Sequence, residues 1–278
     1  MSTVSTAQES HQNVSSTESP IYTLFDLAVV DELDRKHLLD LFAGVLGSIR
    51  IRGFSTADEG AAIVEALADC PMGSYNVQTV VPFIAKLGPA AYDFYGEHGL
   101  TDDYWGNSEE SSRHRSKLMS GIDPLDYAVA KLSRAWGAPL RRATSGGREM
   151  FAGMIRETNG GMRLHWDEIA REFPGALDDM AVCQIAFNWY VSMPEQGGES
   201  VVYRHKWRPA DEAHREGYGY QESVYADEPC VSTRPEAGDA VLFDPRNYHT
   251  VRPSVAGRRI SMSFFLGITG DGSLIYWS

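Results

Sequence analysis

The pattern of hydrophobic and polar positions along the chain changes near residue 147. Before that point, apolar residues between 38 and 46 recur at helical spacing and would form one face of a helix. Residues 48–54 then alternate polar and apolar side chains, which is typical of a half-buried strand. Ser, Thr and Asp residues within 55–58 are suited to cap a second helix that ends near residue 69. The first part of the chain is therefore predicted to be largely helical.

A later helix has clearer boundaries than these two. Asp123 stands at its N-cap position, Pro124 at its first helical position and Gly137 just beyond its end. Proline is favoured at the start of a helix because its fixed φ suits the first turn and the N–H that it lacks would be unpaired there anyway. Between the early helices and this one, residues 72–122 are predicted to be a mixture of helix and loop.

After residue 147 the chain consists of short apolar or alternating runs that are separated by turns. Residues 158–161, Thr-Asn-Gly-Gly, predict a hairpin turn, and residues 194–198 predict another turn. Strands repeated at this spacing indicate a sandwich or a jelly roll, here with the helices packed outside it. The predicted strands cover residues 151–157, 162–167, 183–193, 199–207, 240–243, 249–252 and 260–268.

The expected domain organisation follows from these patterns. Residues 1–20 are rich in Ser, Thr, Gln and Glu, and they contain too few large apolar groups to offset the entropy of ordering, so they predict a disordered tail. Residues 21–278 are expected to form a single domain. Within it, residues 21–147 would be the helical N-terminal portion and residues 148–278 the jelly-roll core.

Composition and charge exclude some classes of function. The net charge of −13 argues against a nucleic-acid groove or a polybasic membrane surface, since both need clustered Lys and Arg. No apolar run approaches the roughly 18 residues that span a bilayer, and the first residues do not resemble a secretory signal. Three cysteines without a CxxC pair favour a reducing cytoplasm. The expected partner is a small-molecule substrate, and nothing in the sequence predicts the oligomeric state.

Two histidines are followed, two positions on, by an acidic residue. Chance alone would produce roughly one such pair in a chain with 8 His and 38 acidic residues, so the context must decide. His214 and Glu216 lie in a run that is polar on all sides, which indicates a solvated helix or loop. His165 and Asp167 lie in a predicted strand, where residues two apart project from the same face. The pair His165 and Asp167 is therefore the candidate metal site.

His249, near the start of a later predicted strand, is the candidate third ligand. Two histidines and one carboxylate on one face of an octahedral ion leave three positions open, as non-haem Fe(II) requires in order to bind a bidentate cosubstrate together with O2. Other interpretations remain open at this point. The alternative for His249 is a core histidine bonded to a carbonyl, and the alternative for Asp167 is the cap of the segment that follows it.

Arg259 is the candidate anion-binding residue, because a guanidinium can form paired, charge-assisted bonds to a carboxylate. Ser261 shares its strand face and would add a hydroxyl. The adjacent Arg258 makes the register ambiguous, and a structural ion pair is the alternative role for Arg259. Asn188, a polar residue in an aromatic strand, would either bond to the cosubstrate or pair within the core.

Several other residues are assigned less specific roles. Trp166, on the face opposite the two candidate ligands, is expected to pack in the core, and His205 is expected to be exposed. The stretch around Tyr218 and Tyr220 is interpreted either as a mobile lid or as an ordinary loop.

In its order of motifs, the second half resembles the Fe(II)/2-oxoglutarate-dependent oxygenases. The motifs are His-Trp-Asp at 165–167, Gly-Gly-Glu-Ser at 197–200, Gly-Asp-Ala-Val-Leu-Phe at 238–243, then His249, and Arg-Ile-Ser at 259–261. The resemblance implies a double-stranded β-helix fold that is mainly β with α and cupin-like. It also implies that His165, Asp167 and His249 bind iron, and that Arg259 and Ser261 bind the distal carboxylate of 2-oxoglutarate.

Within that superfamily the chain looks most like the carrier-independent group that includes the welwitindolinone-type halogenases. Those enzymes have Gly where this chain has Asp167, and the Gly leaves an iron position for chloride. The resemblance therefore implies hydroxylation, or a related oxidation, of a C–H bond in a specialised metabolite, with O2 consumed and succinate and CO2 released. Three alternatives remain: a halogenase-related variant, a cupin-type metalloenzyme that does not use 2-oxoglutarate, and a jelly-roll binding module without catalysis.

Overall fold

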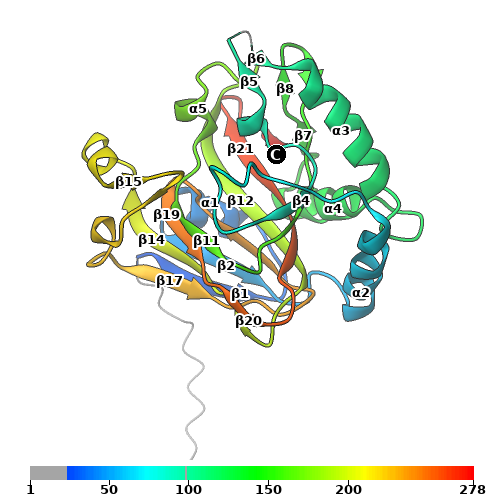
Figure 1. Ribbon diagram of the computed structural model, residues 1–278, viewed down its shortest axis with the longest axis horizontal. Helices are drawn as coiled ribbons and strands as arrows, with labels where there is room; N and C mark the ends of the chain where they lie inside the picture. Colours follow the sequence, from blue (N-terminus) through cyan, green and yellow to red (C-terminus); the bar gives the residue numbers. More distant parts are fainter. Residues whose placement is uncertain (1–23, 98) are drawn as a thin grey trace, which may run out of the picture.

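The computed structural model describes residues 24–97 and 99–278, and two facing β-sheets form its centre (Figure 1). The predicted tail, residues 1–20, lies outside the described residues. The larger sheet has ten strands, and neighbours in the following order are hydrogen-bonded. They are β1 (Asp26–Val30), β2 (Leu46–Ile51), β18 (Ala240–Phe243), β12 (Ala181–Ser192), β21 (Ile260–Thr269), β10 (Met154–Glu157), β4 (Ala85–Leu87) and β3 (Gly73–Ser74), with β22 (Leu274–Trp277) joining β21 to β7 (Arg141–Arg142).

The smaller sheet has four antiparallel strands. Their order is β11 (Met162–His165), β19 (Asn247–Val251), β14 (Ser200–Lys206) and β17 (Cys230–Thr233). Four two-stranded ribbons complete the β structure: β5 (Tyr95–Gly96) with β6 (Gly99–Leu100), β8 (Thr144–Ser145) with β9 (Arg148–Glu149), β13 (Gln196–Gly197) with β20 (Ser254–Ala256), and β15 (Arg215–Glu216) with β16 (Gly219–Tyr220). The predicted jelly roll, a mainly β fold with added helices, is confirmed.

The alternation of side chains along β12 shows how the larger sheet is covered on both faces. Phe187 and Trp189 pack outward into a core shared with the helices. Ala186 and Tyr190 point the other way and pack with apolar residues of the smaller sheet. Because successive side chains of a strand alternate between faces, Asn188 shares the inner face with these two residues. The two faces of β12 thus serve different regions. One face packs into the hydrophobic core between the sheet and the helices, and the other lines the space between the two sheets.

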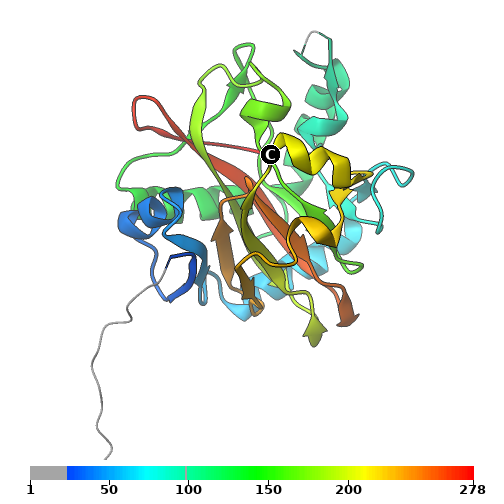
Figure 2. The same ribbon diagram turned by 90° about the vertical axis from the view of Figure 1, so that its left-hand side faces the viewer.

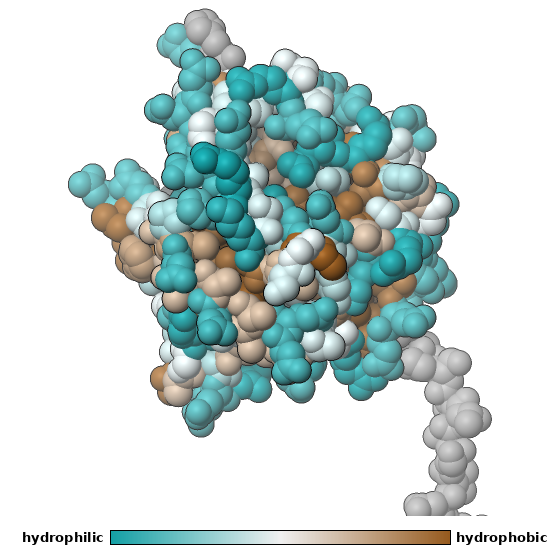
Figure 3. Space-filling model, turned by 90° about the vertical axis from the view of Figure 1, so that its right-hand side faces the viewer, coloured by the Kyte–Doolittle hydropathy of each residue, from teal (hydrophilic) through white to brown (hydrophobic). Residues whose placement is uncertain are grey.

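Helices cover the outer face of the larger sheet, as the sequence predicts. In Figure 1, α2, α3 and α4 lie on the opposite side of the strands from β14, β17 and β19, and the surface on the helical side is mostly hydrophilic (Figure 3). No helix of the described residues is long and apolar enough to span a membrane. The helices are α1 (Arg35–Phe42), α2 (Ala57–Ala66), α3 (Asp102–Arg115), α4 (Pro124–Trp136) and the short α5 (Ile169–Glu172), with 3-10 turns at Leu67–Asp69, Ala91–Asp93, Pro209–His214 and Glu222–Val224.

Two helix boundaries distinguish what the sequence predicted well from what it did not. For α4 the predicted signals are all present: Asp123 accepts a hydrogen bond from the N–H of Leu125, and Gly137 is left-handed with φ 81°. The prediction of a helix through residue 46 was wrong. Helix α1 ends at Phe42, because Gly44 adopts a φ of 73° and turns the chain into β2.

The predicted hairpin at residues 158–161 was also wrong. Strand β10, before the turn, belongs to the larger sheet, whereas β11, after it, belongs to the smaller sheet. The Gly-rich turn therefore carries the chain from one sheet to the other. Residues 194–198 do the same between β12 and β14. The N-terminal portion also contributes β1, β3, β4 and β7 to the larger sheet, in addition to β2, which overlaps the strand predicted at residues 48–54.

An ion pair fastens α3 to α4 at the edge of the core. The Arg115 side chain is 3% exposed, and it donates through Nε and Nη2 to the two carboxylate oxygens of Asp123, at 2.9 and 3.0 Å. It also donates to the carbonyl of Ala152. Asp123 therefore both caps α4 and neutralises a buried guanidinium.

The substitution Asp123→Ala is expected to lower the free energy of unfolding by about 3–5 kcal/mol, because it leaves a buried charge without its partner. Urea denaturation would measure the loss. Asp126→Ala, which removes an exposed carboxylate from the same helical turn, is the matched control and should cost less than about 0.5 kcal/mol. Equal losses in the two variants would contradict the role of the ion pair.

Candidate metal centre

Two histidines meet on neighbouring strands of the smaller sheet. His165 ends β11 and His249 lies in the middle of β19, and the antiparallel register places them directly opposite each other. Their ring centroids are 4.2 Å apart. Directly opposed residues of antiparallel strands project from the same face of a sheet. Strand pairing thus brings together two imidazoles that are far apart in the sequence.

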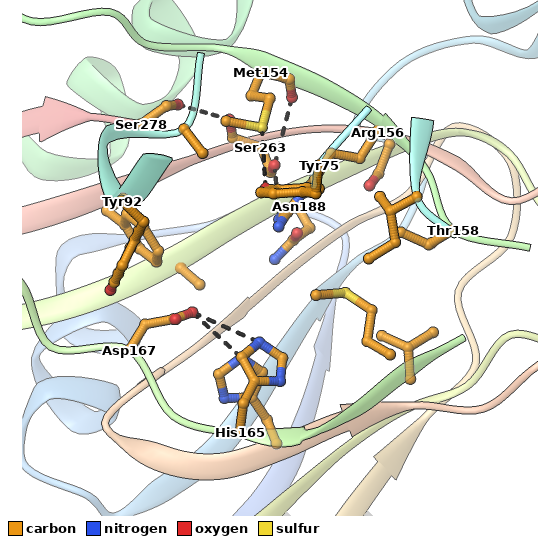
Figure 4. Close-up of a pocket in the computed structure, with 18 of the residues that line it drawn as sticks. Tyr75, Tyr92, Met154, Arg156, Thr158, His165, Asp167, Asn188, Ser263 and Ser278 are labelled. Atoms are coloured by element: carbon orange, nitrogen blue, oxygen red, sulfur yellow. Dashed lines mark hydrogen bonds and ion pairs between the residues drawn. The ribbon is translucent and has the colours of Figure 1, made fainter. Parts of the chain in front are cut away.

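Asp167 completes the group from the loop after β11. Its N–H donates to the carbonyl of Pro245 at 2.9 Å, which ties this loop to the segment before β19. Its Oδ2 lies 3.8 Å from His165 Nε2 and 3.6 Å from His249 Nε2 (Figure 4). One ligand atom from each of the three residues lies within 4.8 Å of the others, so a single ion would reach all three.

Backbone carbonyls fix the orientation of both imidazole rings. His165 Nδ1 lies 2.7 Å from the carbonyl oxygen of Arg163. His249 Nδ1 lies 3.0 Å from the carbonyl oxygen of Asn247. A carbonyl only accepts hydrogen bonds, so each Nδ1 carries the proton and each Nε2 is left for a metal ion.

The protonation states at this site suit a metal ion. Burial, followed by the effect of His249, lowers the pKa of His165 to about 4, so its ring is neutral at neutral pH. Burial opposes ionisation of Asp167, but the interactions with both histidines outweigh it and hold the pKa of this carboxyl below its usual value. Two imidazoles and one carboxylate are a donor set for non-haem Fe(II), and the residues present therefore fit that ion.

Arg259, just before β21, is buried and has only neutral partners. The residue is 3% exposed, and it makes no ion pair within residues 24–97 and 99–278. A buried guanidinium without a counter-charge is costly, and a bound anion offsets that cost. The guanidinium donates to the carbonyl of Gly198 at 3.0 Å, Thr158 Oγ1 at 2.8 Å, Ser200 Oγ at 3.0 Å and the Tyr190 hydroxyl at 3.2 Å.

One cavity of about 260 Å³ is lined both by Arg259 and by the three candidate ligands. Its floor is the inner face of the larger sheet, where Asn188 is paired with Ser263 and Tyr190 with Ser261. The segment around β4 supplies further wall residues, among them Tyr75, Tyr92 and Asp93. Arg215 and Tyr218 line it from the segment at 209–224, which stands in front of the sheets in Figure 2.

The structure places every predicted cosubstrate residue in this cavity. Ser261 is 2% exposed and Asn188 is 8% exposed, and neither side chain has a hydrogen-bond partner among the described residues. The two polar groups are therefore available to a ligand. The choice between the adjacent arginines is also clear, because Arg258 is exposed and bonded to Glu157 at 2.7 Å, whereas Arg259 faces the cavity.

The prediction for His205 was wrong. The residue is 6% exposed, with Nδ1 at 3.0 Å from Glu228 and Nε2 at 3.1 Å from Asp211. The polar residues that surround it in the sequence suggested exposure, whereas these two distant carboxylates compensate its burial. His214 and Glu216 are exposed, in agreement with their assignment as solvated residues.

The aromatic residues beside the site are held in place by hydrogen bonds. Trp166 packs near Trp207, with ring centroids 5.3 Å apart, and donates to the hydroxyl of Tyr220, but it also lines the cavity. The Tyr218 hydroxyl accepts a hydrogen bond from the N–H of Arg163 at 2.8 Å, and its ring meets the edge of His165.

Sequence reasoning missed several residues of the cavity. Thr158, Tyr190 and Ser200 surround Arg259, but each lies in a different strand or turn, so no local pattern connects them. Arg156 also lines the cavity from β10. The one available signal was the charged Arg156 directly after the mostly apolar run at 150–155.

Comparisons with known proteins agree with this geometry. The family model for the carrier-protein-independent halogenase WelO5 matches residues 125–278. The L-gamma-glutamyl-L-propargylglycine hydroxylase of Streptantibioticus cattleyicolor is 42% identical over 248 residues, which cover 88% of this chain and 92% of that protein. The leucinostatins biosynthesis cluster protein S of Purpureocillium lilacinum is 27% identical over 208 residues, or 70% of this chain and 83% of that protein.

Solved structures show the same fold. An N-substituted L-amino acid dioxygenase from Burkholderia ambifaria superposes with a TM-score of 0.58 at 15% identity, covering 88% of this chain and 92% of that one. Its complex with alpha-KG gives a TM-score of 0.55 at 14% identity, covering 87% and 90%. The predicted double-stranded β-helix is thereby confirmed. Given the family match and the 42% identical relative, the chain belongs to the carrier-protein-independent halogenase WelO5 family of Fe(II)/2-oxoglutarate-dependent oxygenases.

Proposed function

We propose that this enzyme hydroxylates a C–H bond of a small, amino-acid-derived metabolite, with His165, Asp167 and His249 as its iron ligands. In this assignment Arg259 binds the distal carboxylate of 2-oxoglutarate, assisted by Ser261 and Asn188. The observation that carries the proposal is the buried Arg259 without an acidic partner, in the same cavity as the His-Asp-His group. A cupin-type metalloenzyme that does not use 2-oxoglutarate would have no need of such a residue.

The residues of the chain have separate tasks in this reaction. When bound, Fe(II) and 2-oxoglutarate supply the oxidising power, since O2 is consumed, succinate and CO2 are released and one oxygen atom reaches the substrate. The carbonyls of Arg163 and Asn247 keep both imidazoles aligned for metal binding. Thr158 and Ser200 hold the Arg259 guanidinium in a fixed orientation, so the cosubstrate meets a preformed binding site.

Asp167 favours hydroxylation over halogenation, although the family is named for a halogenase. With iron bound, its carboxylate would be a ligand at the position that the family resemblance assigns to chloride in the halogenases that have Gly there. The relative with 42% identity is named as a hydroxylase, which supports the same assignment. That relative's substrate, L-gamma-glutamyl-L-propargylglycine, is our guide to the substrate class.

The remaining assignments concern the chain as a whole. We propose that residues 21–278 act as one domain, because strands from the N-terminal portion pair within the larger sheet. The acidic net charge favours a small-molecule substrate over nucleic acid or membrane partners. Cys70, Cys183 and Cys230 are free thiols, which is consistent with a cytoplasmic enzyme.

Anaerobic addition of Fe(II) and 2-oxoglutarate is expected to produce the weak visible charge-transfer band of the chelate. Arg259→Met should raise the 2-oxoglutarate concentration needed for the band by about 10- to 100-fold, because a charge-assisted hydrogen-bond pair is lost. Asp167→Ala should weaken iron binding itself. Arg258→Met is the matched control and should behave as the wild type. Iron binding without a band would favour another cupin chemistry, and the absence of iron binding would refute the assigned ligands.

Aerobic incubation with 2-oxoglutarate and L-gamma-glutamyl-L-propargylglycine is expected to yield a product that is heavier by one oxygen atom, together with an equal amount of succinate. Mass spectrometry in the presence of excess chloride would check the outcome. Because the Asp167 carboxylate is present, no chlorinated product should form. A chlorinated product from the wild type would contradict the proposed hydroxylation.

A further inference from the structure

A second arginine in the cavity lacks an acidic partner. Arg156 lies on β10, is half-buried and makes no ion pair within the described part of the chain. Its Nη2 donates to Ser263 Oγ at 2.9 Å. It also interacts with the hydroxyl of Tyr75, where it opposes the rise in pKa that burial causes. A guanidinium has five N–H donors, so these two neighbours leave donors free to face the cavity.

The position of Arg156 separates it from the Arg259 site. The sheet register pairs Arg156 with Ser261, so it lies on the flank of β21 opposite the one that faces β12 and Tyr190. The two guanidiniums have no neighbour in common among their recorded hydrogen bonds. In Figure 4, Arg156 and Asp167 are on opposite sides of the pocket.

Other charged groups of the cavity are already compensated. Asp93 pairs with Lys86 at 3.1 Å, and Arg215 pairs with Glu212 at 3.4 Å. Glu172 accepts a hydrogen bond from the Tyr92 hydroxyl. Burial, followed by the charge of Asp167, raises the pKa of Glu172 to about 8, so this group is mostly uncharged at neutral pH.

The bound cosubstrate does not balance the remaining charge. In the proposed function, one carboxylate of 2-oxoglutarate pairs with Arg259 and the other belongs to the chelate at the metal. Arg156 then remains as a half-buried cation in the cavity with no anion paired to it among the described residues, which is unfavourable unless another ligand supplies the anion.

We infer that Arg156, oriented by Ser263, binds a carboxylate of the substrate, and that the enzyme therefore selects an amino acid or a peptide-like derivative with a free carboxylate. This inference rests on the proposed function, whose substrate class it makes more specific. An anchored carboxylate fixes the distance of the reacting carbon from the metal ligands, because the guanidinium is itself held by the sheet. The other possible source of the anion is 2-oxoglutarate itself, through the carboxylate that is not bound by Arg259.

The test compares L-gamma-glutamyl-L-propargylglycine with its two mono-amides, each of which has one carboxylate replaced by a carboxamide. Calorimetric titration into the anaerobic Fe(II)- and 2-oxoglutarate-loaded protein measures their affinities. For the wild type, one of the two amides is expected to bind about 10- to 100-fold more weakly than the parent. In Arg156→Met, the affinity for the parent dipeptide should fall by the same factor, and the difference in affinity between the parent and that amide should vanish. Arg156→Lys keeps the positive charge but lacks the planar guanidinium with its paired donors. Its affinity for the parent dipeptide should lie between those of the wild type and Arg156→Met.

Controls separate the two possible sources of the anion. Titration of the visible band in Arg156→Met should give an unchanged affinity for 2-oxoglutarate. Arg215→Met removes a cavity arginine that already has an acidic partner, and it should keep the difference in affinity between the parent dipeptide and its amide. A loss of 2-oxoglutarate affinity in Arg156→Met would overturn the inference in favour of the cosubstrate. It is equally overturned if the wild type binds both amides as tightly as the parent, or does not bind the dipeptide. A wild type without the visible band would instead refute the proposed function, and the inference with it.

Discussion

The pairing of β11 with β19 is the constraint on which the site depends. It sets His165 against His249, and a shift of one residue in either strand would turn one imidazole to the opposite face of the sheet. The hydroxyl of Thr250 donates to the carbonyl of Met162 at 2.6 Å and helps to hold this register. Asp167 is in turn tied to Pro245, beside the second strand. Metal affinity is therefore a property of the sheet register as much as of the three ligand residues.

Electrostatics divides the cavity between the two sheets. The smaller sheet presents two imidazoles and the nearby carboxylate of Asp167, whereas the side of the larger sheet presents two guanidiniums, that of Arg156 on β10 and that of Arg259 just before β21. Among residues 24–97 and 99–278, both cations are hydrogen-bonded to hydroxyl or carbonyl groups, and neither forms an ion pair with an acid. Such an arrangement is unfavourable without a bound anion and becomes favourable once carboxylate ligands bind. The guanidinium donors are already oriented, so ligand binding loses little further conformational entropy.

The sequence was sufficient for those features that depend on local spacing. The caps of α4 and the choice of Arg259 over Arg258 follow from patterns a few residues long. The predicted strand at 162–167 was too long, because β11 ends at His165 and Asp167 reaches the site from the loop that follows. Features that depend on distant partners could not be predicted. The turn at 158–161 has the composition of a hairpin, yet the chain crosses between sheets there, because β10 and β11 find better partners in β21 and β19. The burial of His205 likewise depends on Asp211 and Glu228, which no local pattern connects with it.

The crossing turn between β10 and β11 has a consequence for how such enzymes diversify. It separates Arg156, on the larger sheet, from His165, on the smaller sheet that also bears His249. Substitutions in β10, or in the wall segment around β4, can therefore change which molecule is accepted without altering the coordination sphere. Two homologues with the same His-Asp-His group need not share a substrate, and the residue that aligns with Arg156 would be more informative for sorting them than the metal ligands.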